Sequence, residues 1–198
     1  ALISARVEAI GGINIPSIQA VSVEEDGCWS ITRDYIEGKT LTELMKEKPD
    51  KRDEYLNQMV ELQLMIHSKT CPLLNKLKDK MARQISEMEE LDPVNRYDLL
   101  TRLDSTPKHI KLCHGDFQPD NIIVKEDGTM YVVDWVHATQ GNASADVART
   151  YLLFCLTDQA AAEKYLDLFC EKTGTEKRYV QGWLPVAVSY THLRAHET

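Results

Sequence analysis

One stretch organises this chain: residues 114–124, which read HGDFQPDNIIV. Its polar first part is followed by β-branched residues, and the Asp-Gly pair at 127–128 provides a hairpin turn signal before a second apolar run over residues 130–133. We therefore expect a polar loop that enters a tight hairpin, and an exit strand that ends in the carboxylate of Asp134.

Three oxygen-bearing side chains should meet at one end of this small sheet: Asp116, Asn121 and Asp134. Phosphoryl transfer needs positioning and charge neutralisation more than covalent help. A carboxylate can orient the attacking hydroxyl and accept its proton, and oxygen ligands can hold magnesium against phosphates. The trio is therefore typical of phosphoryl transfer from a nucleotide, with Asp116 as the catalytic base and Asn121 and Asp134 as metal ligands.

The spacing of the trio matches that of the kinase catalytic loop, H-R-D-x-x-x-x-N, which is followed by a second metal-binding Asp after a strand. Asp116 and Asn121 keep the separation of base and Asn in that loop, and Gly115 stands in place of the Arg. Asp134 opens Asp-Trp-Val where a protein kinase has Asp-Phe-Gly.

Taken together, HGDFQPDN, VVDW and GNASADVA at residues 141–148 resemble the aminoglycoside phosphotransferase and choline kinase family of small-molecule kinases. The likeness runs from about residue 16 to residue 151. It implies an α+β, protein-kinase-like fold, with an incomplete N-terminal lobe sheet and a mainly helical C-terminal lobe that carries the catalytic hairpin. It also implies ATP and Mg²⁺ as cofactors, and as acceptor the hydroxyl of a small molecule such as an aminoglycoside, a choline-like amino alcohol or a sugar.

The resemblance also divides the chain into parts. Residues 1–34 would be a partial N-terminal lobe, residues 35–38 the hinge, and residues 39–187 the helical lobe with the catalytic loop. The composition shifts abruptly near residue 188, so we interpret residues 188–198 as a non-native tail. The phosphate loop, the strand Lys and its Glu partner are missing, and we expect them upstream of residue 1. We expect this fragment itself to be inactive.

Further roles follow from the same resemblance. The backbone around Asp34, Tyr35 and Ile36 would bind the nucleotide base at the hinge. His114 would brace the catalytic loop, and Asp146 would anchor that loop through hydrogen bonds to its backbone. A plainer reading of Asp146 is a carboxylate in the first turn of a helix, where it favours the helix dipole.

Two other interpretations stay open. His114, Asp116 and Asp134 could form a hydrolytic metal site, although no further His or carboxylate follows at ligand spacing nearby. Alternatively, the chain could be a nucleotide-binding pseudokinase or an interaction module without catalysis, for which the absent Lys and phosphate loop would be the signature.

Local signals predict several helices. Thr40 with Glu43 forms a capping box, which predicts a helix over residues 41–47. An amphipathic stripe predicts a longer helix over residues 50–68. Ser144 is a candidate N-cap for the helix after the GNASADVA stretch.

Composition excludes several classes of protein. The 198 residues carry a net charge of −8, which argues against a nucleic-acid binder, because such proteins are usually basic. No apolar run approaches the length of a membrane span. The five cysteines are scattered and never spaced as C-x-x-C, a usage typical of a reducing compartment. We therefore expect a cytoplasmic protein with neither nucleic acid nor membrane as partner, and nothing in the sequence indicates its oligomeric state.

Overall fold

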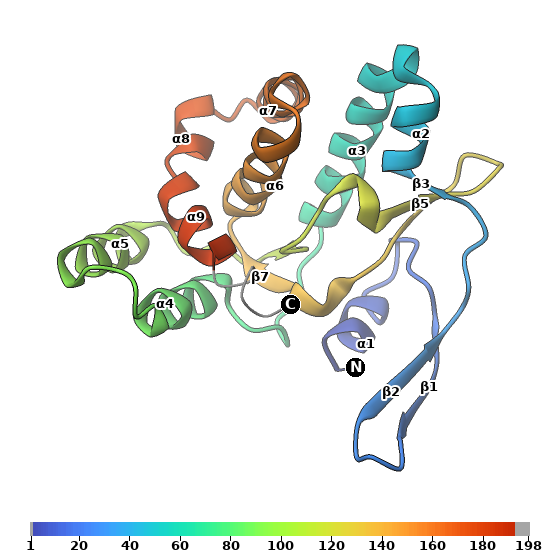
Figure 1. Cartoon of the computed structure of the whole chain (residues 1–198), viewed down its shortest axis with the longest axis horizontal. Helices are drawn as coiled ribbons and strands as arrows, with labels where there is room; N and C mark the ends of the chain where they lie inside the picture. Colours follow the sequence, from blue (N-terminus) through green and yellow to red (C-terminus); the bar gives the residue numbers. More distant parts are fainter. Residues whose placement is uncertain (1, 193–198) are drawn as a thin grey trace.

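Helices outweigh strands in the computed structural model, which describes residues 2–192 (Figure 1). The described strands gather into small antiparallel sheets, so the predicted α+β class is confirmed. The helices are α1 (Leu2–Glu8), α2 (Leu41–Glu47), α3 (Arg52–His67), α4 (Leu77–Glu87), α5 (Pro93–Ser105), α6 (Ala143–Thr157), α7 (Gln159–Thr173), α8 (Lys177–Gln181) and α9 (Leu184–His192). The strands are β1 (Ile18–Val23), β2 (Trp29–Arg33), β3 (Lys39–Thr40), β4 (Lys111–Cys113), β5 (Ile122–Val124), β6 (Met130–Val132) and β7 (Thr139–Gly141), and the 3₁₀ turns are η1 (Pro49–Lys51), η2 (Pro119–Asn121) and η3 (Trp135–His137).

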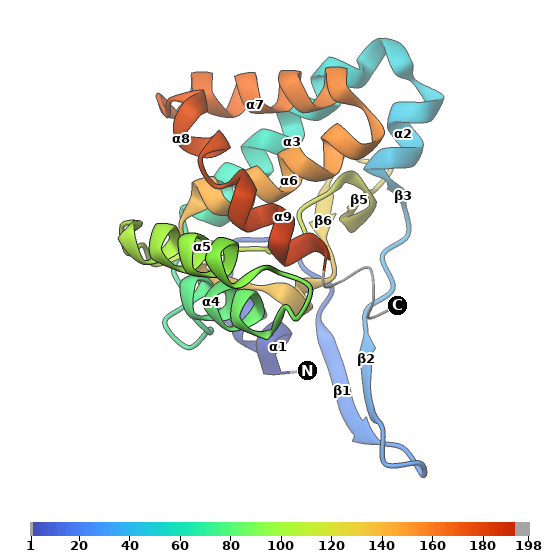
Figure 2. The same ribbon diagram turned by 60° about the vertical axis from the view of Figure 1, so that its left-hand side comes forward.

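The hairpin of β1 and β2 projects from the helical body, as both Figure 1 and Figure 2 show. Two contacts tie α1 to its base. The Glu8 carboxylate accepts a hydrogen bond from Ile18 N at 3.1 Å, and Arg33 Nη2 donates to Ser4 Oγ at 2.9 Å. Ile18 and Arg33 are cross-strand partners at the base of the hairpin, so both strands are held to α1 there.

The chain then crosses onto a second sheet, in which β5 lies between β3 and β6. Gly38 makes this crossing close: a Cβ there would lie 2.4 Å from the carbonyl oxygen of Val124. The capping box predicted for α2 is present, because Glu43 N donates to Thr40 Oγ1 and Thr40 N donates to Glu43 Oε2. The helix therefore begins where the sheet ends, next to the β5–β6 hairpin.

Much of the core lies around α7, which packs against both α3 and α6 (Figures 1 and 2). The amphipathic stripe of α3 supplies Leu56 and Met59, and α7 supplies Tyr165 and Phe169; all four side chains are buried. None of the helices described here is long and apolar enough to cross a membrane.

One sequence interpretation needs correction. Helix α6 begins at Ala143 and its N-cap is Asn142, whose Oδ1 accepts from Ser144 N at 2.9 Å, so Ser144 is not the cap. Helix α9 runs across residue 188, and the interpretation of residues 188–198 as a non-native tail stays a prediction. The rest of the proposed tail, residues 193–198, lies outside the described residues.

Candidate active site

The HGDFQPDN stretch forms a loop between β4 and β5, with its last turn in η2. Gly115 has φ of +80°, and a Cβ at this position would lie 2.5 Å from the carbonyl oxygen of His137. Left-handed backbone and close approach both require glycine here. This explains why the loop carries Gly where the protein-kinase motif carries Arg.

His114 is buried and both of its ring nitrogens are engaged. Nδ1 accepts from Asp116 N at 3.2 Å, which leaves Nε2 as the protonated nitrogen that donates to Val133 O at 3.0 Å. Burial lowers the pKa of His114 below its ordinary value, so the ring is held neutral. His114 therefore braces the loop against the end of β6 and has no nitrogen left for a metal, which argues against the hydrolytic metal site.

Asp116 and Asn121 are in direct contact. Asn121 Nδ2 donates to the backbone oxygen of Asp116 at 2.8 Å and lies 3.5 Å from Asp116 Oδ2. Gln118 Nε2 approaches the same carboxylate oxygen at 3.4 Å. The Asp116 side chain is mostly buried, so these donors surround a carboxylate that has little contact with bulk water.

Asp134 lies at the exit of the hairpin, next to Asn121. Val133 N donates to Asn121 O at 3.0 Å, which extends the β5–β6 pairing by one step and brings the residue after Val133 to the same end of the sheet. Asp134 is exposed and has φ of +59°, the one positive φ found for a non-glycine in the described chain. Such a backbone costs energy in an L-residue and is often found at functional sites.

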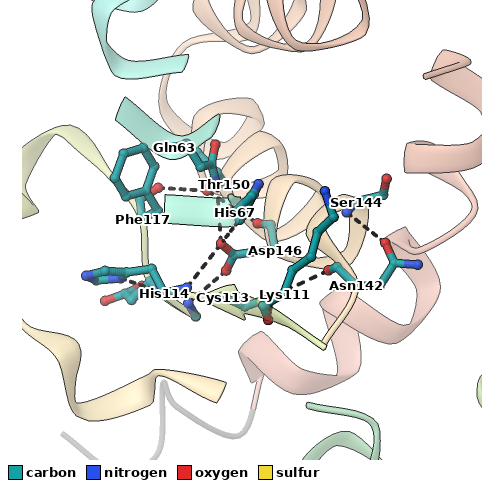
Figure 3. Close-up of polar contacts among 12 residues, drawn as sticks. Gln63, His67, Lys111, Cys113, His114, Phe117, Asn142, Ser144, Asp146 and Thr150 are labelled. Atoms are coloured by element: carbon teal, nitrogen blue, oxygen red, sulfur yellow. Dashed lines mark hydrogen bonds and ion pairs between the residues drawn. The ribbon is translucent and has the colours of Figure 1, made fainter. Parts of the chain in front are cut away.

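Asp146, in the first turn of α6, joins the loop to α3 (Figure 3). Its Oδ1 accepts from Gly115 N at 2.7 Å, and its Oδ2 accepts from His114 N at 3.2 Å. His67 Nε2 lies 2.9 Å from Oδ2, and Gln63 Nε2 lies 3.4 Å from it. Burial acts to raise the pKa of Asp146, but the hydrogen bonds from His67 and Gly115 outweigh it and leave that pKa below its ordinary value.

Other side chains at the site were not predicted. Arg149 Nη2 donates to Asp116 Oδ1 at 3.2 Å, and both side chains are buried. Thr150 Oγ1 donates to Phe117 O at 2.7 Å, as Figure 3 shows. Both residues follow Asp146 by about one helical turn, so they share its face of α6. That spacing was a usable signal, since it points polar side chains at the loop that Asp146 anchors.

His67, Cys113 and Asp146 also bring ligand-type atoms within 4.8 Å of one another. Burial raises the pKa of the Cys113 thiol well above its ordinary value, and metal ligation requires the thiolate. The Asp146 oxygens already accept four hydrogen bonds. We therefore interpret this cluster as structural.

The predicted hinge residues lie in the extended segment between β2 and β3. Asp34 N donates to Ser17 O at 3.0 Å, and Asp34 Oδ1 accepts from Gln19 at 2.6 Å. Tyr35 is 90% exposed and Ile36 is half-buried. The Asp34 N–H is thus already used, which leaves its carbonyl and the backbone of the two following residues for a ligand.

The model of the phosphotransferase enzyme family matches residues 8–183. The chain belongs to this family. No curated protein matches this phosphotransferase at a significant level.

Solved structures share the fold of this phosphotransferase. A thermostable mutant of aminoglycoside phosphotransferase APH(4)-Ia, in ternary complex with ADP and hygromycin B, matches with a TM-score of 0.69 at 16% identity over 94% of this chain and 72% of that one. A choline/ethanolamine kinase family protein from Mesorhizobium loti matches with a TM-score of 0.57 at 16% identity, over 96% and 68% of the two chains. Macrolide 2′-phosphotransferase type I matches with a TM-score of 0.60 at 11% identity, over 98% and 71%. The predicted resemblance and the protein-kinase-like fold are thereby confirmed.

Proposed function

We propose that this phosphotransferase transfers the γ-phosphoryl group of ATP to the hydroxyl of a small molecule. Family membership gives the reaction class, and the loop geometry supports the roles of the residues. One observation carries the proposal. Asn121 contacts Asp116 through its side chain and pairs with Val133 through its backbone, so the loop base and the Asp134 strand end belong to one connected unit.

Asp116 is the proposed catalytic base. Arg149 Nη2 donates to Oδ1, and we assign to Oδ2 the role of orienting the acceptor hydroxyl and taking its proton. Gln118 and Asn121 lie at 3.4 Å and 3.5 Å from Oδ2, long enough that a substrate hydroxyl can displace them as its partner. His114 and Asp146 keep the loop in place and do not touch the reacting atoms.

The donor set at the hairpin end fits Mg²⁺, which prefers carboxylate and amide oxygens. Asn121 Nδ2 is turned to the Asp116 carbonyl, so its Oδ1 faces the other way, and the exposed Asp134 directly follows Val133, which pairs with Asn121. Asn121 and Asp134 would hold the ion. When bound, Mg²⁺ would neutralise phosphate charge.

The nucleotide base would use backbone groups between β2 and β3, namely the carbonyl of Asp34 and the amides of Tyr35 and Ile36. The ternary complex of APH(4)-Ia with ADP and hygromycin B supports a site for both nucleotide and acceptor in this fold. A cytoplasmic location fits the five cysteines, which are all free thiols.

The test uses the protein with a phosphate loop and strand Lys included, and measures release of ADP on addition of ATP, Mg²⁺ and a panel of amino alcohols, sugars and antibiotics. Asp116→Asn should lower turnover by about 10² or more, the scale of a general base, with ATP affinity unchanged. Asp104→Asn is the matched control, because Asp104 is exposed and lies away from the loop. Wild-type turnover in Asp116→Asn would exclude this base. ATP binding with no turnover on any acceptor would favour the non-catalytic nucleotide-binding alternative.

A further inference from the structure

A cavity of about 600 Å³ opens beside the catalytic loop, between α2, the start of α3 and the C-terminal half of α6. Its floor includes Gln118, Pro119 and Asp120 of the loop, together with Thr150 of α6. Volumes of this size hold drug-sized ligands in proteins. The cavity is not part of the polar network around Asp146, so it needs an explanation of its own.

The cavity adjoins the proposed base. Gln118 lines the cavity and its Nε2 lies 3.4 Å from Asp116 Oδ2. Thr150, also on the lining, donates to Phe117 O and so fixes the loop next to Asp116. A molecule in this cavity that displaces Gln118 could therefore place a hydroxyl next to Asp116.

The walls of the cavity are mostly apolar. Helix α2 and the turn after it contribute Met45 and Pro49, and α6 contributes Leu153, Phe154 and Leu156. Leu156 is 70% exposed, although it lies on the lining. An apolar wall that water reaches gains free energy when an apolar ligand covers it.

The charges on the lining are few and balanced. Arg52 of α3 forms an ion pair with Asp158, so these two charges neutralise each other. Within the described residues, Lys46 and Asp120 form no ion pair. Outside that ion pair the lining thus offers one carboxylate, Asp120, and one cation, Lys46, so a ligand with several positive charges would find a partner for only one of them.

We infer that this cavity binds the acceptor, and that the acceptor is a hydroxyl compound with a large apolar body and a single cationic amine. The amine pairs with Asp120, the body covers the Met45 and Leu156 walls, and the hydroxyl points at Asp116. Polycationic acceptors are disfavoured. The inference rests on the proposed function, because it takes Asp116 as the base.

Binding is measured by calorimetry on the full chain, without turnover, with two hydroxyl-rich probes of opposite character. Erythromycin has an apolar ring and one tertiary amine, whereas hygromycin B is polar and polycationic. Erythromycin should bind at least about tenfold more tightly, and Asp120→Asn should weaken its binding about tenfold, equivalent to the loss of one ion pair. Tighter binding of hygromycin B, absence of erythromycin binding, or an unchanged affinity in Asp120→Asn would each overturn the inference.

A matched pair of variants distinguishes the loss of an apolar contact on the cavity wall from the general effect of adding a negative charge to the surface. Leu156→Asp places a carboxylate on the lining, and Leu73→Asp does the same on another exposed leucine, 68% exposed and outside the cavity. Erythromycin affinity should fall about tenfold in the first variant and stay unchanged in the second. Equal effects in both would overturn the assignment of this wall.

Failure of this inference can be told apart from failure of the proposed function. If hygromycin B binds more tightly and is phosphorylated in an Asp116-dependent reaction, only the acceptor class is wrong. If erythromycin binds as expected but Asp116→Asn keeps full turnover, the cavity stands and the catalytic base is wrong.

Discussion

Arg149 holds one carboxylate oxygen of Asp116, at 3.2 Å, in a site where both side chains are buried. The two residues are brought together by α6, whose first turn also carries Asp146, the anchor of the loop backbone. The same helix therefore fixes where the loop lies and how its carboxylate is turned. This explains how the loop can present the Asp116 carboxylate in one orientation.

Replacement of Arg149 tests this arrangement. In Arg149→Met the Asp116 carboxylate loses its donor at Oδ1, so turnover should fall by about 10². Arg149→Lys keeps a cation that can donate there and should recover part of that turnover, although not all, because Lys lacks the planar fork. Full turnover in Arg149→Met would contradict a role in orienting Asp116.

Asp134→Asn should raise the Mg²⁺ concentration needed for half-maximal nucleotide binding by about tenfold or more, because an amide is a weaker ligand than a carboxylate. The measurement is a Mg²⁺ titration of ATP binding. Asp127→Asn serves as control, since Asp127 is an exposed turn residue on the same hairpin that accepts from Thr129 N. Equal Mg²⁺ dependence in both variants would remove Asp134 from the metal site.

Substitutions at two glycines distinguish the energetic cost of a left-handed backbone from the cost of steric crowding. Gly115 and Gly128 have nearly the same φ, +80° and +83°, but only Gly115 is crowded, by His137 O at 2.5 Å. Gly128→Ala should cost about 1 kcal/mol of unfolding free energy, the cost of left-handed backbone. Gly115→Ala should cost roughly 3 kcal/mol or more, because the loop must also shift. Denaturant unfolding checks both, and equal costs would show that the loop can yield.

Asp146→Asn should destabilise the fold by about 3 kcal/mol, because buried amide donors lose a charged acceptor. The carboxylate serves the backbone of both His114 and Gly115, so turnover should fall together with stability. The free energy of unfolding of Asp104→Asn, at a nearly fully exposed site, provides the comparison. A stable Asp146→Asn protein with full turnover would show that the loop holds its shape without this anchor.

Stability should also depend on pH through His114. Its pKa in the folded protein is lowered by burial, so its contribution is fully present above the unfolded pKa of about 6.5 and is lost as pH falls below that value. The free energy of unfolding should therefore decline as the pH falls from about 7 to about 5. His114→Gln should flatten this decline, and His109→Gln, at an exposed site, should not. The reverse pattern would mean that another histidine dominates.

The local features of this structure could be predicted from the sequence. Residue spacing within 114–134 was enough to predict the hairpin, because turn chemistry and β-branched runs act over a few residues. The Thr40–Glu43 capping box is equally local and was predicted correctly. The contacts that complete the site are not local. His67 reaches Asp146 across 79 positions, and no pattern in a single sequence specifies such a pairing.

The N-cap of α6 and the burial of Arg149 could not be predicted from the sequence, because both depend on how distant segments pack. The sequence favours Ser144 as the N-cap of α6, but Asn is an equally good cap, and Asn142 takes the role because it directly follows β7. A lone Arg in a helix usually faces solvent, so the sequence does not predict that Arg149 is buried. Its burial follows from the packing of α6 against the loop, which becomes visible only in three dimensions.

The single carboxylate of Asp146 connects α3, the loop after β4, and α6, which are separated by long stretches of chain. No one of these segments can order the loop before the others have docked. During refolding, catalytic activity should therefore appear in the same kinetic phase as burial of the core. No earlier intermediate should contain an ordered catalytic loop.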